Sequence, residues 1–293
     1  MIYYAIEVMA PLLLAGLGGL FAELAGVLNI ALEGMMLAGA FAAIVTASLT
    51  GSILAGMLGG LLAGLLLAYL FYFVGIRMRA NIFIVGLAIN LLAAGTIPFL
   101  SSAMFGTKGV LRLPNVPRMP GLFVGVETGF PLLDQILFGH SFGVYLTVPA
   151  VLLAGFVLRR TAFGLRLRST GKNPETLRAV GLNPDRYRRA ALLISGMGAG
   201  LAGSLLALRL GVYLPNVSAG RGWIALVTIY LGYKRPVGVL IAALCFALAE
   251  GVSVAAQGVL QIPGTLLLSL PYILTVVAMI VYSAMRRVAP SDA

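Results

Sequence analysis

The 293-residue sequence has few charges and especially few acids, with nine Asp and Glu against 20 Lys and Arg, while 60% of its residues are hydrophobic. A water-soluble domain could not bury that much apolar surface, so lipid is the solvent for most of the chain. The sequence also has one cysteine, Cys245, and one histidine, His140. This excludes an internal disulfide and leaves too few groups for an intramembrane enzyme or a metal cluster. We expect Cys245 to be a small buried side chain.

The charges that are present are unevenly distributed. Residues 1–76 contain three acids and no base, whereas residues 159–189 contain nine Lys and Arg and two acids. A basic loop between apolar segments is typical of the positive-inside rule for membrane proteins. The excess of positive charge therefore indicates membrane orientation and not a nucleic-acid partner.

Runs of about 20 apolar residues predict the membrane spans. The chain reads as one all-α transmembrane domain over 1–293, a helical bundle of about eight full spans plus a short broken or re-entrant segment at 223–233. The first ten residues lack the basic region of a cleavable signal, so the first apolar run is a retained span. The full spans are predicted near 3–20, 34–50, 53–74, 81–100, 141–158, 190–209, 237–256 and 264–284.

The basic residues also predict the orientation of the spans. Arg77 and Arg79, the 159–189 loop, the Lys234–Arg235 pair and the Arg286–Arg287 pair hold 15 of the 20 Lys and Arg. All four groups of basic residues face the cytoplasm if the segment 223–233 crosses the membrane once. The amino terminus then lies outside and the carboxyl terminus in the cytoplasm.

Two segments interrupt the apolar pattern. Residues 21–34, FAELAGVLNIALEG, carry two acids and an amide, and residues 214–238 are broken by Pro215, Gly220 and Gly222. Irregular backbone at membrane depth is tolerated only against protein or a water-filled cavity. One broken segment in each half of the chain indicates the path of a transporter.

The basic loop contains the signals of a short helix. Asn173 is a favoured N-cap, Pro174 suits the first helical position, and Glu175 complements the helix dipole. Gly181 is a typical stop, so we expect a helix over 174–180. A second start at Asn183 opens the next span. The loop could simply set topology, but apolar Leu177, Val180 and Leu182 would suit the groove of a partner.

Three blocks of the sequence resemble one family. GKNPETLRAVGLNPDRYR is similar to the coupling loop of ABC-importer permeases for branched-chain amino acids, simple sugars and nucleosides. ELAGVLNIALEGMMLAGAF and SAGRGWIALVTIYLG resemble two further motifs of that group. The likeness is closest to the smaller permease of nucleoside and simple-sugar importers. The chain departs from the family at Thr176 and Leu177, where a pair of alanines is usual.

The resemblance implies a permease in a bacterial plasma membrane that works with two ATPase subunits, a second and different permease chain, and an extracytoplasmic solute-binding protein. The sequence has no GxxxxGK[ST] phosphate loop, so we expect no cofactor in this chain and ATP use by the partners. The alternative is an ion-coupled secondary transporter of a small neutral solute. The residues implied in coupling to the ATPase are Asn173, Pro174, Glu175, Thr176, Leu177, Arg178, Val180, Gly181 and Asn183.

Polar residues and glycines in the spans are candidates for the solute path. Asn29 and Glu33 could line the path or brace the break, or Asn29 could cap the 34–50 span and Glu33 could meet its dipole. Asn90 could bind solute or form an interhelical hydrogen bond. Glu250 could face solute or form a salt bridge, and Trp223 with Arg221 is typical of an interfacial belt. The resemblance adds Gly222 and Trp223, because GRGW belongs to a family motif near the pathway. The candidates are therefore Asn29, Glu33, Asn90, Gly222, Trp223 and Glu250.

Overall fold

The computed structural model describes residues 1–126 and 129–257, together with 273, 276–277 and 280. Within these residues the secondary structure is helical. The elements are α1 (Ile2–Leu24), α2 (Leu32–Thr50), α3 (Ile53–Phe71), the π-helix η1 (Tyr72–Arg77), α4 (Ile82–Phe105), α5 (Pro131–Leu137), α6 (Phe142–Arg160), α7 (Ala162–Lys172), α8 (Pro174–Ala179), α9 (Pro184–Leu210), α10 (Arg221–Leu231) and α11 (Pro236–Gln257).

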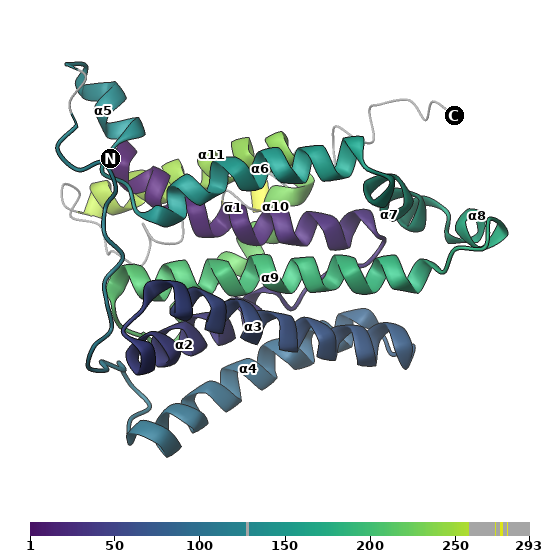
Figure 1. Ribbon diagram of the computed structural model, residues 1–293, viewed down its shortest axis with the longest axis horizontal. Helices are drawn as coiled ribbons and strands as arrows, with labels where there is room; N and C mark the ends of the chain where they lie inside the picture. The colour runs from purple at the N-terminus through teal and green to yellow at the C-terminus, as the bar shows by residue number, and fades with distance from the viewer. Residues whose placement is uncertain (127–128, 258–272, 274–275, 278–279, 281–293) are drawn as a thin grey trace.

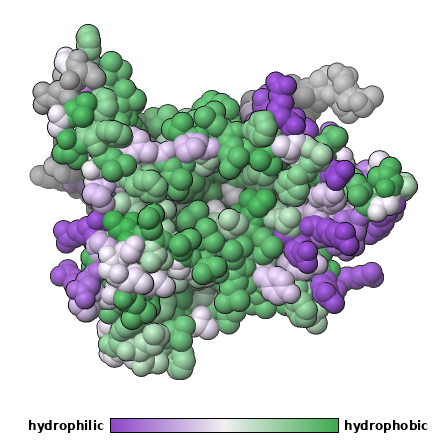
Figure 2. Space-filling view, viewed as in Figure 1, coloured by the Kyte–Doolittle hydropathy of each residue, from purple (hydrophilic) through white to green (hydrophobic). Residues whose placement is uncertain are grey.

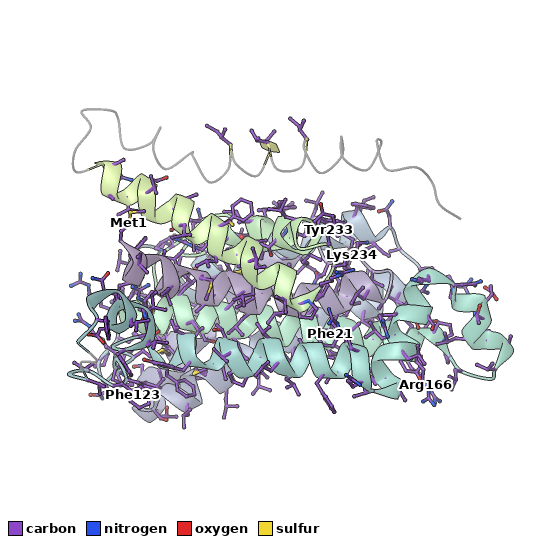
Figure 3. The ribbon with its side chains drawn as sticks, turned by 90° about the horizontal axis from the view of Figure 1, so that it is seen from above. Met1, Phe21, Phe123, Arg166, Tyr233 and Lys234 are labelled. Carbon is purple, nitrogen blue, oxygen red and sulfur yellow. The ribbon has the colours of Figure 1, made fainter. Side chains whose placement is uncertain are left out.

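The long helices lie side by side and give the bundle two ends (Figure 1). The α5 end carries Met1 and Phe123, and the α8 end carries Arg166 and Lys234 (Figure 3). α1 is the central helix, with 94% of its apolar window buried, and it packs against α6, α9, α10 and α11. α9 in turn packs against α2 and α3.

Small residues allow this close packing. A Cβ at Gly39 of α2 would lie 2.4 Å from the carbonyl oxygen of Gly200 on α9, and one at Gly64 of α3 would lie 2.2 Å from that of Gly196. The helices therefore meet backbone to backbone. Such contact is the expected means of association in lipid, where apolar side chains gain little by leaving one apolar medium for another.

Among the residues that the structure describes, seven helices are long and apolar enough to cross a membrane, and they confirm seven of the predicted spans. The predicted span at 264–284 lies mostly outside the described residues. The helix predicted to open at Asn183 and run into the 190–209 span is α9, which begins at Pro184 and is capped by Asn183. The basic loop contains a further helix, α7, which the sequence did not predict.

The surface of the bundle is apolar around its middle and charged at its ends (Figure 2). α3 and α4 expose rows of leucines such as Leu58, Leu62 and Leu91. Cys245 is exposed as well, which corrects the prediction that it is buried. α11 turns Ala243, Phe246 and Ala247 toward the core instead. In a lipid-facing helix an apolar side chain is equally stable on either face, so hydrophobicity alone does not predict burial.

Candidate functional site: two broken helices meet inside the bundle

The first break separates α1 from α2. Gly26 follows α1 with a φ of +77°, a left-handed conformation that glycine adopts without strain. Asn29 then turns the chain into α2: its Oδ1 accepts from the backbone N–H of Ala31 at 3.0 Å. Its Nδ2 donates to Ser195 Oγ on α9 at 2.8 Å. Asn29 is buried, so both ends of its amide hold the break in place.

Asn90 on α4 fixes the same break from the other side. Its Oδ1 accepts from the N–H of Gly34 at 2.8 Å, and its Nδ2 donates to the carbonyl of Ile30 at 3.0 Å. One side chain thus satisfies a donor and an acceptor that the interrupted helix leaves without intrahelical partners. The structure places Asn90 in the interhelical hydrogen bond that was the alternative to a solute contact.

The second break lies between α9 and α10, and Glu33 of α2 connects it to the first. The Glu33 carboxylate accepts from Ser218 Oγ at 2.5 Å and from the N–H groups of Gly220 and Gly222 at 2.8 and 2.7 Å. Glu33 was expected to line the path, to brace the break or to meet the dipole of its own helix. It lies in the first turn of α2, and its carboxylate also caps α10, a helix 185 or more residues away in the sequence.

Gly222 is required by this geometry. A Cβ at Gly222 would lie 2.5 Å from the Glu33 amide nitrogen and 2.6 Å from its Cα. The first turns of α2 and α10 therefore touch backbone to backbone. Both helix N-termini carry partial positive charge, and the buried Glu33 carboxylate lies between them, where both dipoles stabilise it. No intervening side chain would fit.

Arg221 and Glu250 form an ion pair beside this junction. Their side chains are 18% and 13% exposed, so the pair is largely shielded from solvent. This geometry is the salt bridge considered for Glu250, and it pairs Arg221 with α11. The interfacial belt predicted for Trp223 and Arg221 stays a prediction. Trp223 is 42% exposed.

A cavity of about 490 Å³ opens from the second break toward the α5 end. The irregular segment 214–221 forms one wall, and α1 and α9 form the others. Asn216 and Ala219 line it with φ values of +57° and +46°. Left-handed backbone at a non-glycine residue such as Ala219 costs free energy, and strain of this kind is concentrated at functional sites. Polar lining residues include Tyr4, Glu7, Arg209, Asn216 and Arg221.

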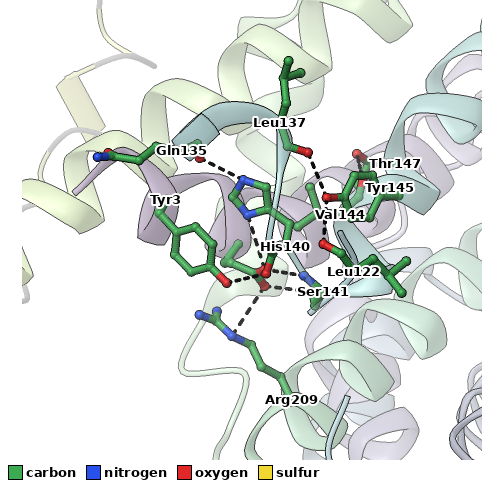
Figure 4. Close-up of polar contacts among 12 residues, drawn as sticks. Tyr3, Leu122, Gln135, Leu137, His140, Ser141, Val144, Tyr145, Thr147 and Arg209 are labelled. Atoms are coloured by element: carbon green, nitrogen blue, oxygen red, sulfur yellow. Dashed lines mark hydrogen bonds and ion pairs between the residues drawn. The ribbon is translucent and has the colours of Figure 1, made fainter. Parts of the chain in front are cut away.

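Glu7 is a buried acid that the sequence analysis did not single out. Its carboxylate accepts from the Ser141 N–H at 2.6 Å and from Ser141 Oγ at 2.8 Å, which caps the start of α6. Arg209 Nε lies 3.5 Å away, and His140 Nδ1 lies 3.4 Å away. His140 is itself fully buried and stacks on Tyr3 (Figure 4). An acid within an apolar span is unusual, and this rule could have identified Glu7.

The helix predicted in the basic loop is present as α8, beyond the end of the bundle (Figure 1). Asn173 Oδ1 accepts from the N–H of Glu175, and Gly181 has a φ of +76°, as the cap and stop signals predict. Val180 is 68% exposed, but Leu177 is only 4% exposed. Leu177 therefore packs within this chain and holds α8 in place, whereas Val180 is free to contact a partner.

The remaining residues of the predicted coupling set lie at the surface of this loop. Glu175 and Arg178 form an exposed ion pair at 2.5 Å. Asn183 caps α9 by accepting from the N–H of Asp185 at 2.9 Å. Thr176 is exposed and Pro174 is half-buried.

α7 brings this loop into contact with the first break. A Cβ at Gly171 near the end of α7 would lie 2.3 Å from the carbonyl oxygen of Leu24 and 2.9 Å from the amide nitrogen of Gly26. Glu23, near the end of α1, pairs with Lys234 at 2.6 Å. The end of α1 is thus held between α7 and the turn that follows α10. A displacement of α7 would act directly on the break at Gly26.

A bundle of apolar spans, with two interrupted helices meeting at its centre and an amphiphilic helix outside one end, defines a polytopic membrane permease. Residues 1–283 match the family described as branched-chain amino acid transport system / permease component, and the chain belongs to this family. The family resemblance seen in the sequence is confirmed. The chain is a multi-span permease of the ABC transporter class and not an enzyme.

Characterised relatives cover nearly the whole chain. The guanosine ABC transporter permease protein NupQ of Bacillus subtilis (strain 168) is 33% identical over 92% of this chain and 88% of its own. The nucleoside ABC transporter permease protein NupC of Lactococcus lactis subsp. cremoris (strain MG1363) is 32% identical over 96% and 90%. The putative glucose ABC transporter permease protein TsgC13 of Haloferax volcanii is 32% identical over 86% and 76%.

Solved structures share the fold. An inward-facing conformation of a putative metal-chelate type ABC transporter matches with a TM-score of 0.54 at 18% identity, over 95% of this chain and 84% of that one. PsaBC from Streptococcus pneumoniae in complex with Fab matches with a TM-score of 0.52 at 13% identity, over 94% and 90%. At these identities the likeness concerns the fold alone.

Proposed function

We propose that this chain forms the solute path of an ATP-driven importer for a nucleoside or a simple sugar. Two relatives that cover most of the chain are named for guanosine or nucleoside transport and a third for glucose transport. The cavity beside the second break supports a polar, uncharged cargo, because its Arg209 and Arg221 are each close to a carboxylate. Hydroxyl groups can bind to such a lining without leaving a net charge buried.

We further propose that α8 couples the path to ATPase subunits. The observation that carries this proposal is the contact of α7 with the break at Gly26, because it gives α8 a short rigid route to the irregular backbone. ATP binding would move α8 and α7, and the break would transmit the motion to α2 and, through Glu33, to α10. ATP acts in the ATPase subunits, and this chain supplies no nucleotide site.

The orientation follows from this role. The α8 end faces the cytoplasm, where the ATPase subunits lie, in a bacterial inner membrane. α1 then starts outside, and the α5 end meets the solute-binding protein. A second permease chain packs against this one, and the exposed apolar faces of α3 and α4 are large enough to serve either that chain or lipid.

The test uses Val180→Asp in the complete transporter, reconstituted with its ATPase subunits and binding protein. Val180 is exposed, so the change should leave the bundle folded but should place a charge in the ATPase contact. We expect loss of ATPase co-purification and of uptake. Val110→Asp is the control for ATPase co-purification, because Val110 is 48% exposed and lies in the segment after α4, at the end away from the ATPase subunits.

Normal uptake and co-purification by Val180→Asp would refute the coupling role of α8. Uptake by the chain in proteoliposomes without ATPase subunits would favour the ion-coupled alternative. Competition among labelled guanosine, another nucleoside and glucose in the intact transporter would identify the cargo. No competition by any of the three would refute the proposed solute class.

A further inference from the structure

A second cavity, of about 500 Å³, lies at the α8 end of the bundle. It is enclosed by the first break at Gly26 and Val27, by the turn from η1 into α4, by α8, and by the first residues of α9. Three arginines line it, one from each of the last three elements: Arg79, Arg178 and Arg188. Gly26 and Arg178 also belong to the coupling elements described above, whereas the cavity beside the second break shares no lining residue with this one.

The arginines carry more positive charge than the acids around them neutralise. Arg178 pairs with Glu175 at 2.5 Å, and Arg188 pairs with Asp185 at 3.2 Å. In the part of the chain that the structure describes, Arg79 has no carboxylate within ion-pair distance. Asp185 is the one acid in the lining. The cavity therefore has a net positive charge.

Arg188 is only partly covered by its acidic partner. Its Nη1 contacts Asp185, and its side chain is 24% exposed. A guanidinium carries five N–H donors, so a contact with one carboxylate leaves donors for a further acceptor. Arg79, at the other wall, has a φ of +56°, an unfavourable conformation for a residue with a side chain.

We propose that this cavity binds the phosphate group of an anionic phospholipid. Guanidinium groups match phosphate oxygens with two parallel hydrogen bonds, and several of them around one cavity are typical of phosphate recognition. Basic pockets between membrane helices bind lipid head groups. α4 begins at the cavity with Ile82 and continues with exposed apolar Ile84, Leu87 and Leu91, which can contact acyl chains.

The bound phosphate would connect elements that otherwise make few contacts. Arg178 belongs to α8, Arg188 to α9 and Arg79 to the turn before α4. A shared anion would fix α8 relative to the bundle, and it would do so beside the break at Gly26. The lipid therefore acts as a structural ligand that holds α8 in position.

The experiment measures lipid retained by the full chain purified from vesicles that contain phosphatidylglycerol and phosphatidylcholine. Bound phosphatidylglycerol is quantified by native mass spectrometry in the wild type, in Arg79→Gln, in Arg188→Gln and in the double variant. We expect retention to fall about five-fold per arginine and about 25-fold in the double variant. Arg159→Gln and Arg160→Gln are matched controls, since both are exposed at the end of α6, outside the cavity.

Equal retention of phosphatidylglycerol in the cavity variants and the α6 variants would overturn the proposal, because it would show only general attraction of anionic lipid to basic residues. Inorganic phosphate serves as the competing probe. An excess should displace little lipid, because the free ion lacks acyl chains. Displacement by an equimolar amount would assign the site to a soluble anion and overturn the lipid assignment. None of these readouts depends on transport, so they stand apart from the proposed import function.

Discussion

The Glu33 carboxylate of α2 accepts a hydrogen bond of 2.7 Å from the backbone N–H of Gly222 in the first turn of α10. This contact joins the two interruptions of the bundle, which are separated by 189 residues in the sequence. A movement of either break would therefore act on this contact with the other.

Removal of the Glu33 carboxylate should weaken the junction in graded steps. Ser218→Ala removes one of three donors, Glu33→Gln places an amide NH₂ against backbone donors, and Glu33→Ala removes every bond. Hydrogen bonds to charged groups contribute about 1.5–3 kcal/mol each, so thermal stability should fall in that order. Thermal melting in detergent measures the series. Equal melting temperatures for Glu33→Ala and the wild type would contradict the role of Glu33.

Gly222→Ala should abolish uptake, because the added Cβ would overlap the backbone of Glu33 at 2.5–2.6 Å. The junction would have to open to admit the methyl group. Gly95→Ala on α4 is the control, since a Cβ there meets nothing within 4 Å. Uptake and folded yield are measured for both variants. Wild-type uptake by Gly222→Ala would show that the two helix ends do not need to touch.

Gly171→Ala should uncouple ATP hydrolysis from uptake if α7 drives the first break. Its Cβ would lie 2.3 Å from the Leu24 carbonyl oxygen, so α7 must move away from the end of α1. We expect ATPase co-purification to persist while uptake falls about ten-fold or more. Gly155→Ala on α6, where a Cβ meets nothing within 4 Å, provides the comparison. A parallel decline of co-purification and uptake would instead indicate a local folding defect.

Glu7→Gln should loosen the segment between α4 and α6. The change keeps the size of the side chain but places an amide NH₂ where the carboxylate accepted from the Ser141 N–H and hydroxyl. We expect faster proteolysis within residues 106–141 and a lower melting temperature, with ATPase co-purification unchanged because α8 lies at the other end. Unaltered proteolysis would show that Glu7 does not anchor this segment.

The buried phenol of Tyr213 should make the fold sensitive to strong base. Tyr213 lies between α9 and α10, and burial raises its pKa from 10.0 to about 12. A raised pKa favours the neutral phenol in the folded chain, so this residue contributes a constant stability below about pH 10 and loses it between pH 10 and 12. Melting temperatures across that window should fall less steeply in Tyr213→Phe. If the melting temperature falls equally steeply with pH in both proteins, Tyr213 is excluded as the cause of the sensitivity to base.

Much of the fold was determined by the sequence itself. Seven spans were predictable from the length of apolar runs, because a helix is the form in which a chain satisfies its backbone groups in lipid. The helix boundaries in the basic loop were also predictable, because capping involves side chains and backbone only a few residues apart. They are the caps at Asn173 and Asn183 and the stop at Gly181. The two interruptions were also visible as glycine, proline and charge within apolar runs.

Tertiary structure decided what those local features contact. Nothing in the residues around Glu33 indicates that its carboxylate also caps α10. Cys245 was expected to be buried and is exposed, because in lipid an apolar side chain gains little from burial and hydrophobic patterning does not distinguish inside from outside. Leu177 was expected to face a partner and is buried within the chain, a contact that only the folded loop reveals. Which helices approach depends on close backbone packing at residues such as Gly39 and Gly222, and that fit exists only once the bundle has assembled.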